Sequence, residues 1–272
     1  ILDSAEAARA VSAFCRREKT TIPVLLEIDV DGHRSGIRPD GAELLPAAAA
    51  LADGAELVGV LTHAGDSYEC KTTAEIEAAA EAERAGIVLA AERLRAAGHT
   101  VKIVSAGSTP TLMFAKDETG VTEMRAGVCA LFDLFMSNVG ACTVDDIAGS
   151  VLATVIGRQV DKRRVILDCG FLALSRDRGT ARQAHDYGYG LVCGLDGKPL
   201  ADGTIVLTGT NQEHGILTLP ENSPLTQEDF PIGRRLRILP NHACPTAAPY
   251  GSLVLIENGR VAEVLDHVRG WD

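Results

Sequence analysis

The first half of the chain repeats one pattern of apolar and polar positions. A short apolar run is followed by a turn and then by an alanine-rich stretch whose apolar residues recur every three to four positions. Such runs predict strands, and such spacing predicts amphipathic helices. The predicted strands cover residues 1–3, 24–30, 57–62, 101–105 and 121–125, and the predicted helices cover residues 5–17, 41–52, 73–97 and 107–114. Strands that alternate with helices indicate a parallel sheet with right-handed crossovers.

The second half has a different pattern. From about Gly127 the helical spacing fades, and glycine, proline, aspartate and asparagine separate short strand-forming runs. These runs cover residues 151–158, 164–169, 190–193, 204–209, 215–219, 234–238, 252–257 and 260–265. Glu257-Asn-Gly-Arg260 predicts a two-residue hairpin turn of the Asn-Gly type. The chain is therefore predicted to hold an α/β domain over residues 1–130 and an all-β domain over residues 131–272, with the boundary near 127–150.

The number of strands in the α/β half leaves two interpretations open. About five strands are predicted, the first cut short at Ile1, whereas a closed (β/α)8 barrel needs eight strands and roughly 250 residues. Either the domain is a small open sheet, or the first strands of a barrel are absent from the sequence. Because the chain opens on a truncated strand without an initiator methionine, we favour a barrel that lacks its N-terminal strands.

Composition narrows the classes of function. The net charge of −11 argues against a nucleic-acid partner, but it does not exclude an anionic substrate in a locally positive pocket. Seven cysteines, an odd number at irregular spacings, indicate reduced thiols in the cytoplasm rather than a disulfide framework. The apolar runs fall short of the ~18 residues of a membrane span, and the chain does not start with a signal segment.

Three segments of the α/β half end predicted strands with residues suited to chemistry. Residues 105–111 (SAGSTPT) follow a strand and open a helix, so they either bind a phosphate group or form a polar loop that caps the helix. Arg34, between two glycines, either reaches an oxyanion or is a surface residue in a turn. His63, at another strand end, either contacts a flat cofactor, acts as a base, or is structural.

The β half carries the most informative motif, residues 239–246 (LPNHACPT). It puts His242 and Cys244 two positions apart between two prolines, and in an extended segment both side chains would point the same way. Imidazole and thiolate suit zinc or a similar metal, and two protein ligands leave positions open for water or substrate. The alternative is a capped turn with a core cysteine. Segments 168–177, 186–190 and 212–215 have residues that could line a pocket, although turns are the default for all three.

Together these segments resemble the fold-type III pyridoxal-phosphate (PLP) enzymes of the D-serine dehydratase and D-threonine aldolase group. The likeness covers essentially the whole chain and is strongest in EIDVDGHRSG, LTHAGDSYE, SAGSTPT, SRDRGTARQ, NQEHG and LPNHACPT, in this order. It implies an alanine-racemase-like (β/α)8 barrel, here partial over residues 1–130, and a C-terminal β domain over residues 131–272 that carries a metal site. It also implies a homodimer.

The resemblance carries roles over to particular residues. Arg34 would bind the phenolic oxygen of PLP, His63 would stack on or beside its ring, and Tyr187 would also contact it. The PLP phosphate would be bound by Ser105, Gly107, Ser108 and Thr109. His242 and Cys244 would hold zinc or another divalent metal ion. Aldolase relatives tend to have His-x-Asp at the metal site, so His-x-Cys favours the dehydratases.

One feature departs from the family pattern. The family holds PLP as a Schiff base on a lysine of the first barrel strand, in a segment of the His-Val-Lys-Thr type. None of the six lysines of this chain lies in such a segment: Lys19, Lys71, Lys102, Lys116, Lys162 and Lys198. We therefore expect roughly 100 N-terminal residues to be absent from this sequence, with the missing strands. The chain alone is not expected to turn over.

The resemblance implies a dehydratase that uses PLP and a divalent metal. It would convert a D-3-hydroxy amino acid, such as D-serine or D-threo-3-hydroxyaspartate, into a 2-oxo acid and ammonia. A second substrate carboxylate would need a cation, for which Arg176, Arg178 and Arg182 are candidates, although they fit a solvated run equally well. The alternatives are an aldolase that forms glycine and an aldehyde, and a non-catalytic or degenerate homologue. The metal pair argues against a racemase, and the β domain argues against a simple PLP carrier.

Overall fold

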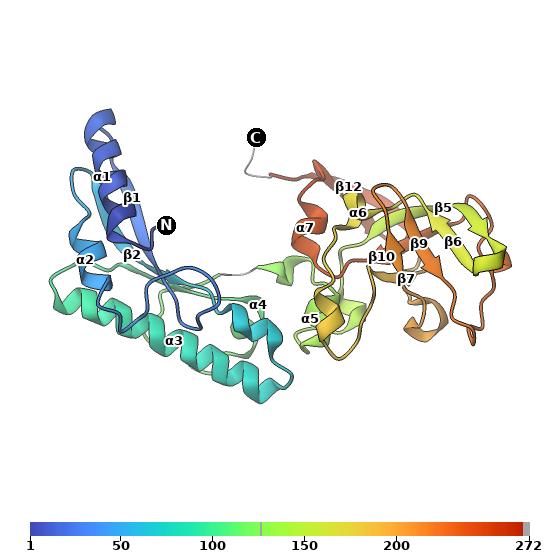
Figure 1. Ribbon diagram of the computed structural model, residues 1–272, viewed down its shortest axis with the longest axis horizontal. Helices are drawn as coiled ribbons and strands as arrows, with labels where there is room; N and C mark the ends of the chain where they lie inside the picture. The colour runs from blue at the N-terminus through green and yellow to red at the C-terminus, as the bar shows by residue number, and fades with distance from the viewer. Residues whose placement is uncertain (126, 269–272) are drawn as a thin grey trace. The chain divides into compact units, whose positions relative to one another are not determined.

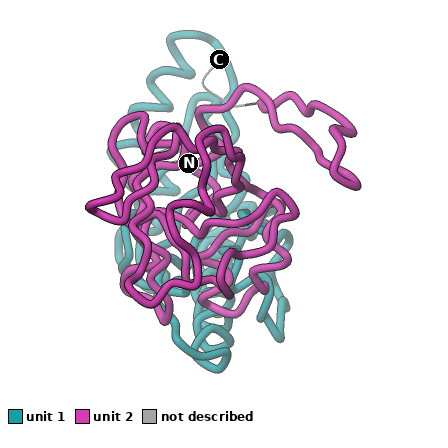
Figure 2. The backbone as a smooth tube through the Cα atoms, turned by 90° about the vertical axis from the view of Figure 1, so that its right-hand side faces the viewer, with its two compact units in different colours: residues 1–129 teal, residues 130–272 magenta. Residues whose placement is uncertain are grey.

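The computed structural model describes residues 1–125 and 127–268. The chain divides into two compact units, Ile1–Cys129 and Ala130–Asp272, which Figure 2 shows in different colours. Each unit has its own main sheet (Figure 1). Each also has its own hydrophobic core. Among the described residues, no helix combines the length and the apolar character that crossing a bilayer requires.

The first unit is built on a parallel four-stranded sheet. The strands lie side by side in chain order: β1 (Ile22–Ile28), β2 (Ala55–Thr62), β3 (Ile103–Ala106) and β4 (Glu123–Met124). The helices are α1 (Ala5–Glu18), α2 (Leu44–Ala49), α3 (Thr73–Ala96) and α4 (Thr109–Phe114), with a 3-10 turn, η1 (Gly65–Glu69). Because all strands are parallel, their carboxyl ends lie at one edge of the sheet, which is where barrel enzymes carry their sites. The predicted α/β class is confirmed for this unit.

Local signals in the sequence explain where the helices begin and end. The Ser4 hydroxyl accepts a hydrogen bond from the Ala7 N–H and caps α1. Thr72 and Glu75 form a capping box at the start of α3. The helix ends before Gly98, which adopts a positive φ of 91°. The core of the unit forms where buried α3 residues, among them Ile87, meet the buried residues of the sheet.

Two elements of the first unit differ from the pattern-based prediction. The predicted strand at residues 1–3 is a single parallel bridge between Leu2 and Leu26, so it lies beside β1. The predicted helix over 41–52 is shorter, because Gly41 donates its N–H to the Arg38 carbonyl in a turn before α2 begins. Helix α4 begins at Thr109 rather than at residue 107, because Ser108 takes the N-cap position.

The second unit is built on an antiparallel six-stranded sheet. Its strand order is β7-β10-β5-β6-β9-β8. The strands are β5 (Val151–Gln159), β6 (Arg164–Leu167), β7 (Leu191–Cys193), β8 (Gly209–Thr210), β9 (Gly215–Thr218) and β10 (Arg235–Leu239). The predicted strand over 204–209 is wrong for most of its length, since Val206 and Leu207 form only isolated bridges and β8 begins at Gly209. Phe230 is fully buried in the core beneath this sheet.

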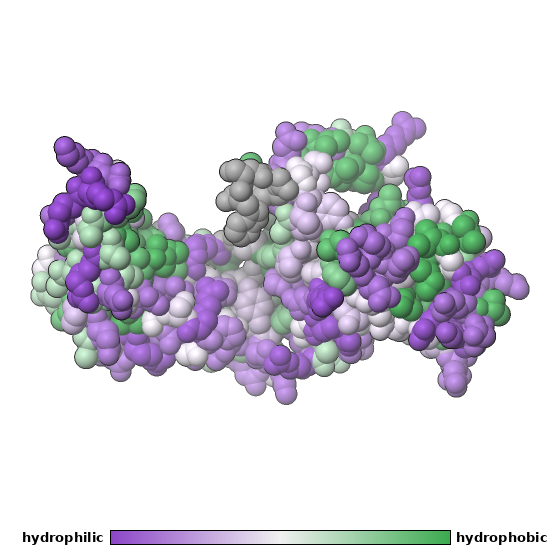
Figure 3. Space-filling model, turned by 45° about the horizontal axis from the view of Figure 1, so that its top comes forward, coloured by the Kyte–Doolittle hydropathy of each residue, from purple (hydrophilic) through white to green (hydrophobic). Residues whose placement is uncertain are grey.

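A separate hairpin, β11 (Ser252–Glu257) and β12 (Arg260–Asp266), follows the main sheet. Its turn residues Asn258 and Gly259 both have positive φ, 51° and 72°, as the Asn-Gly hairpin turn requires, so that prediction is confirmed. The hairpin exposes Val254, Leu255, Ile256, Val261, Val264 and Leu265. Such residues contribute to the hydrophobic surface of the second unit in Figure 3.

The sequence pattern missed the short helices of the second unit. They are α5 (Leu134–Asn138), α6 (Phe171–Leu174) and α7 (Ala243–Ala247). The 3-10 turns outside η1 are η2 (Val128–Ala130), η3 (Val144–Asp146), η4 (Val160–Lys162), η5 (Gly179–Arg182), η6 (Leu200–Gly203) and η7 (Gln227–Asp229). Helices of one or two turns are too short to show a 3.6-residue period, so their sequences read as loops. The unit is therefore β-rich rather than purely β.

Candidate functional site

The ends of β2 and β3 bring predicted cofactor residues together in the first unit. His63 directly follows β2, and Ser105 is opposite Leu61 in the parallel register of β3. The Nδ1 of His63 lies 3.0 Å from the carbonyl oxygen of Gly107. Because a carbonyl can only accept, His63 carries a proton on Nδ1, and this bond fixes the plane of its ring. The histidine ring is therefore held beside the loop that follows β3.

The loop after β3 has its shape fixed from within. Gly107 adopts a φ of 136°, and a Cβ at this position would lie 2.8 Å from both the backbone nitrogen and the carbonyl oxygen of Arg125. The Ser108 hydroxyl caps α4 and lies 2.8 Å from the Ser67 hydroxyl. The Ser105 hydroxyl donates to Glu123 over 2.5 Å. Two of the three predicted phosphate-binding hydroxyls are therefore engaged inside the protein.

Thr109 differs from both serines. Its residue is 1% exposed, and its Oγ1 is the buried side-chain polar atom for which the described residues provide no hydrogen-bond partner. A buried hydroxyl without a partner costs roughly 1–3 kcal/mol, so a ligand oxygen at this position would be favoured. A Cβ added to Gly127 would come within 3.2 Å of this hydroxyl, so a side chain there would crowd it.

Arg125, which the sequence analysis did not single out, ties the strand ends together. Its guanidinium donates to the Ser105 hydroxyl over 2.7 Å, to the Gly107 carbonyl over 3.2 Å and to the Thr62 carbonyl. Burial lowers the pKa of Arg125, and the carboxylates of Glu83 and Glu123 partly offset this effect. Arg125 follows β4, a strand of only two residues, and is not part of a recognisable sequence motif. Its contacts therefore become visible only in the folded structure.

Arg34 lies apart from these hydrogen bonds. Its side chain is exposed and lies 3.8 Å from the carboxylate of Glu27, which also accepts from Ser35 over 3.1 Å. The positive charge of Arg34 is among the influences that lower the pKa of Arg125, after burial. Arg34 is therefore near enough to Arg125 for its charge to act on that guanidinium.

The second unit brings His242 and Cys244 together, but not in an extended segment as the sequence predicted. His242 has extended backbone at the N-cap of α7, and Cys244 lies in the first turn of that helix. The period-two reasoning is therefore wrong here, because the chain turns into a helix between the two residues. The side chains are nevertheless close enough to interact, since Cys244 is among the groups that raise the pKa of His242. The thiol is exposed.

Asp177 orients the histidine of this pair. Its Oδ2 lies 2.7 Å from Nδ1 of His242, and its Oδ1 accepts from the Gly179 N–H over 2.7 Å. The His242 bond holds the pKa of Asp177 below its usual range, against the effect of burial. A carboxylate that accepts a hydrogen bond from the Nδ1–H leaves Nε2 as the ligand nitrogen, which is the usual arrangement behind a metal-bound histidine. Asp177 lies inside the SRDRGTARQ segment, and its role was not predicted.

Asp133 stabilises the first turn of α7, the helix that begins after His242. It is 1% exposed, caps α5 through the Met136 N–H and accepts from the Ala243 N–H over 2.8 Å. Burial raises its pKa, and these two backbone hydrogen bonds oppose the rise. Asp133 therefore joins α5 to the start of α7, next to His242.

The charge state of His242 predicts how metal binding depends on pH. Burial lowers the pKa of His242, but Asp177 and Cys244 outweigh burial and raise it to about 10 in the metal-free protein. The imidazole is thus protonated at neutral pH, and a metal must displace a proton to bind. Zinc affinity is expected to rise at least about tenfold per pH unit between pH 6 and pH 8, with proton release. Zinc titrations in weak buffer measure both, and an affinity that does not change with pH would contradict this proton displacement.

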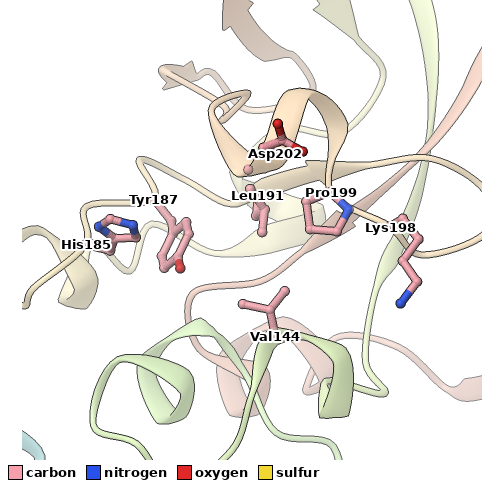
Figure 4. A pocket seen from close by; sticks show the side chains of 8 residues that line it. Val144, His185, Tyr187, Leu191, Lys198, Pro199 and Asp202 are labelled. Atoms are coloured by element: carbon pink, nitrogen blue, oxygen red, sulfur yellow. The ribbon is translucent and has the colours of Figure 1, made fainter.

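Tyr187 lies in the second unit, on the wall of a pocket of about 360 Å³. Figure 4 shows its ring beside His185, with Leu191 and Val144 from other elements. The Tyr187 and His185 rings meet edge to face, with centroids 5.5 Å apart. Burial raises the pKa of Tyr187. The predicted cofactor contact of Tyr187 stays a prediction.

The predicted arginine candidates have different surroundings. Arg178 forms an ion pair with Asp186 over 2.7 Å, and Arg176 lies 3.9 Å above the Phe171 ring. Arg182 is exposed in η5. All six lysines are exposed as well. In the described part of the chain, no group of three or more His, Cys, Asp and Glu side chains is arranged to hold a metal.

Comparisons with known proteins cover both units. The family model described as "Alanine racemase, N-terminal domain" matches residues 1–134, and the one described as "Putative serine dehydratase domain" matches residues 148–256. The D-threo-3-hydroxyaspartate dehydratase of Delftia sp. (strain HT23) is 50% identical over 275 residues, which is 100% of this chain and 72% of that enzyme. The chain belongs to the D-serine dehydratase and D-threonine aldolase family of fold-type III PLP enzymes.

More distant members of this family also align. A D-serine dehydratase of Dictyostelium discoideum is 29% identical over 244 residues, which is 86% of this chain and 61% of that enzyme. Family membership agrees with the predicted resemblance, which is thereby confirmed. The chain has the alanine-racemase-like fold, with a barrel-like N-terminal domain and a β-rich C-terminal domain.

Two solved structures of D-threo-3-hydroxyaspartate dehydratase bear on the second unit. A cysteine-to-alanine variant in the metal-free form has a TM-score of 0.91 and 51% identity, and covers 99% of this chain and 72% of that one. A histidine-to-alanine variant has a TM-score of 0.92 and 50% identity, with 99% and 70% covered. The two substituted positions are two residues apart in that enzyme, the spacing of His242 and Cys244 here.

Proposed function

We propose that the protein is a dehydratase that uses PLP and a divalent metal ion. Its proposed substrate is a D-3-hydroxy amino acid, D-threo-3-hydroxyaspartate or D-serine, and its products are a 2-oxo acid and ammonia. The observation that carries the proposal is the pair His242 and Cys244, oriented by Asp177, in a chain 50% identical to a D-threo-3-hydroxyaspartate dehydratase.

The first unit fits PLP. Bound PLP supplies an electron sink for the bonds at the substrate Cα. The unpaired buried hydroxyl of Thr109 suits a phosphate oxygen. Gly107 has no Cβ, which at this position would clash with the backbone of Arg125. Arg34 and Arg125 provide positive charge for the anionic groups of the cofactor, and His63 offers a ring whose plane is fixed by Gly107. Ser105 and Ser108 support the loop in this proposal, and Thr109 makes the direct contact.

The second unit fits a metal with soft and borderline ligands. A bound divalent metal supplies a Lewis acid that helps hydroxide leave the substrate Cβ. The Nε2 of His242 and the Sγ of Cys244 would be its protein ligands, and imidazole with thiolate favours zinc. Asp177 holds the His242 ring by its Nδ1 proton. Two protein ligands leave positions for the substrate hydroxyl and for water.

The proposed reaction balances without an added oxidant or reductant. The substrate loses a proton from Cα and a hydroxide ion from Cβ, which leaves an enamine. The enamine takes a proton on Cβ and loses one from its nitrogen to become an imine, and water hydrolyses the imine to a 2-oxo acid and ammonia. From 3-hydroxyaspartate the 2-oxo acid is oxaloacetate. The second carboxylate of the 3-hydroxyaspartate substrate requires a cation. Arg178 pairs with Asp186 and Arg176 lies over Phe171, so Arg182 is the candidate that we propose.

An aldolase reaction is the second candidate, because PLP and the divalent metal ion would serve it as well. An aldolase removes the hydroxyl proton and breaks the Cα–Cβ bond to give glycine and an aldehyde. The cysteine of the His-x-Cys pair favours the dehydratase, since the family's aldolases tend to have His-x-Asp. The seven free cysteines suit a reducing compartment, so a cytoplasmic location is part of the proposal, as is a homodimer on the family resemblance.

Product analysis tests the proposed function. The protein as its gene encodes it, supplied with PLP and zinc, is incubated with D-threo-3-hydroxyaspartate, D-serine and D-threonine. We expect equal amounts of ammonia and 2-oxo acid from the first two, and no glycine from any of them. Glycine with an aldehyde would move the function to the aldolase, and the absence of both product pairs would overturn the catalytic proposal.

A further inference from the structure

A buried carboxylate interrupts the apolar stripe of α3. The buried stripe of this helix includes Ile76, Ala80, Ile87, Ala90 and Leu94. Glu83 occupies the position of the stripe between Ala80 and Ile87, at the same three-to-four spacing. Glu83 is 1% exposed. A carboxylate at such a core position costs stability unless hydrogen bonds satisfy it, so its partners indicate why it is there.

Glu83 accepts three hydrogen bonds, all from the proposed cofactor region. Its Oε1 accepts from the Ala64 N–H over 3.0 Å and from the Gly107 N–H over 3.1 Å. Its Oε2 accepts from the Thr111 hydroxyl over 2.7 Å. One side chain from α3 therefore joins the segment after β2, the loop after β3 and the first turn of α4.

Each of these partners is one step from a residue with a proposed cofactor contact. Ala64 follows His63 directly, and the Gly107 carbonyl accepts the His63 ring proton. The Thr111 hydroxyl accepts from the Ser108 N–H over 3.0 Å, which holds the segment that contains Thr109. Both backbone polar groups of Gly107 are therefore hydrogen-bonded. Its N–H donates to Glu83, and its carbonyl accepts from His63 and Arg125.

We propose that Glu83 is a positioning residue that fixes the His63 ring and the loop after β3, the proposed phosphate-binding loop, relative to each other. This inference rests on the proposed PLP site and adds a residue to it. Glu83 touches no cofactor atom in this proposal, since all three of its bonds go to protein groups. Without its carboxylate, two buried backbone N–H groups and one hydroxyl lose their acceptor, and the loop must shift or take in water to satisfy them.

Binding of PLP and of pyridoxal, which lacks the phosphate, tests this role. Dissociation constants are measured by equilibrium dialysis for the wild type, Glu83→Ala and Glu83→Gln. Glu83→Ala is expected to weaken PLP by about tenfold and pyridoxal by much less, because a misplaced loop chiefly loses the phosphate. Glu83→Gln is expected to stay within about threefold of the wild type, because its carbonyl can still accept both N–H groups. Glu77→Ala, on the same helix with an exposed ion pair to Lys116, is the control that should leave both constants unchanged.

The outcomes separate the inference from the proposed function. A wild type that binds PLP no more tightly than pyridoxal overturns the PLP site itself. A wild type that prefers PLP, with the same preference in Glu83→Ala, overturns the positioning role, as does a Gln variant as weak as Ala. Thr111→Val keeps Glu83 and removes one of its three bonds, so it serves if Glu83→Ala does not fold. It must lower the preference for PLP, and an unchanged preference contradicts the inference.

Discussion

Replacing His242 with alanine is expected to lower metal affinity by at least about a hundredfold, because the loss of a direct ligand exceeds the tenfold to hundredfold cost of losing its supporting carboxylate. Ammonia release from D-threo-3-hydroxyaspartate should fall with it, since the leaving hydroxyl loses its Lewis acid. The imidazole also donates to Asp177, so the variant leaves that carboxylate without its partner. Zinc content after dialysis and ammonia release are the two measurements.

His99→Ala is the control for this variant. His99 is partly exposed just after the end of α3, outside the segments assigned to the cofactor and to the metal. It should keep the metal content and the activity of the wild type. A His242→Ala protein with wild-type metal content would contradict the assignment of His242 as a ligand.

Gly107→Ala is expected to weaken PLP by at least about thirtyfold, which corresponds to roughly 2 kcal/mol. The φ of 136° is strained for any residue with a Cβ, and that Cβ would lie 2.8 Å from the backbone of Arg125. The loop after β3 must then move away from β4, and the His63 hydrogen bond to the Gly107 carbonyl moves with it. Equilibrium dialysis with PLP measures the loss.

Gly98→Ala separates backbone strain from loop displacement. Gly98 also has a positive φ, 91°, but a Cβ there meets nothing within 4 Å, and the residue ends α3 away from the loop. Its melting temperature should fall while its PLP affinity stays that of the wild type. Equal losses of PLP affinity in the two variants would show that global destabilisation, and not the shape of the loop, is responsible.

The elements with long, regular patterns could be predicted from the sequence. The 24-residue α3 and the alternation of β2 and β3 with helices carry their periods over enough residues to be read. The hairpin turn at Asn258 and Gly259 was predictable because few residue pairs tolerate two positive φ angles. Helix α7 was not, because five residues that include a proline show no helical period.

The residues that support the site could not be predicted, because their partners are distant in the chain. Asp177 reaches His242 across 65 positions, and Arg125 reaches Thr62 across 63. Thr109 looked like both neighbouring serines in the sequence, and only burial and the hydrogen bonds distinguish its unpaired hydroxyl. Glu83 did leave a signal, since it falls on the apolar stripe of α3 among glutamates that lie off it.

Reversible removal of the metal is the most direct test of metal-assisted dehydration. Ammonia release from D-threo-3-hydroxyaspartate is measured on the gene-encoded protein with PLP, before chelation, after chelation and removal of the chelator, and after zinc is added back. We predict that chelation abolishes ammonia release, that zinc restores it, and that zinc fails to restore it in Cys244→Ala. Ammonia release that continues undiminished in protein shown to be free of metal would contradict a catalytic metal at His242 and Cys244.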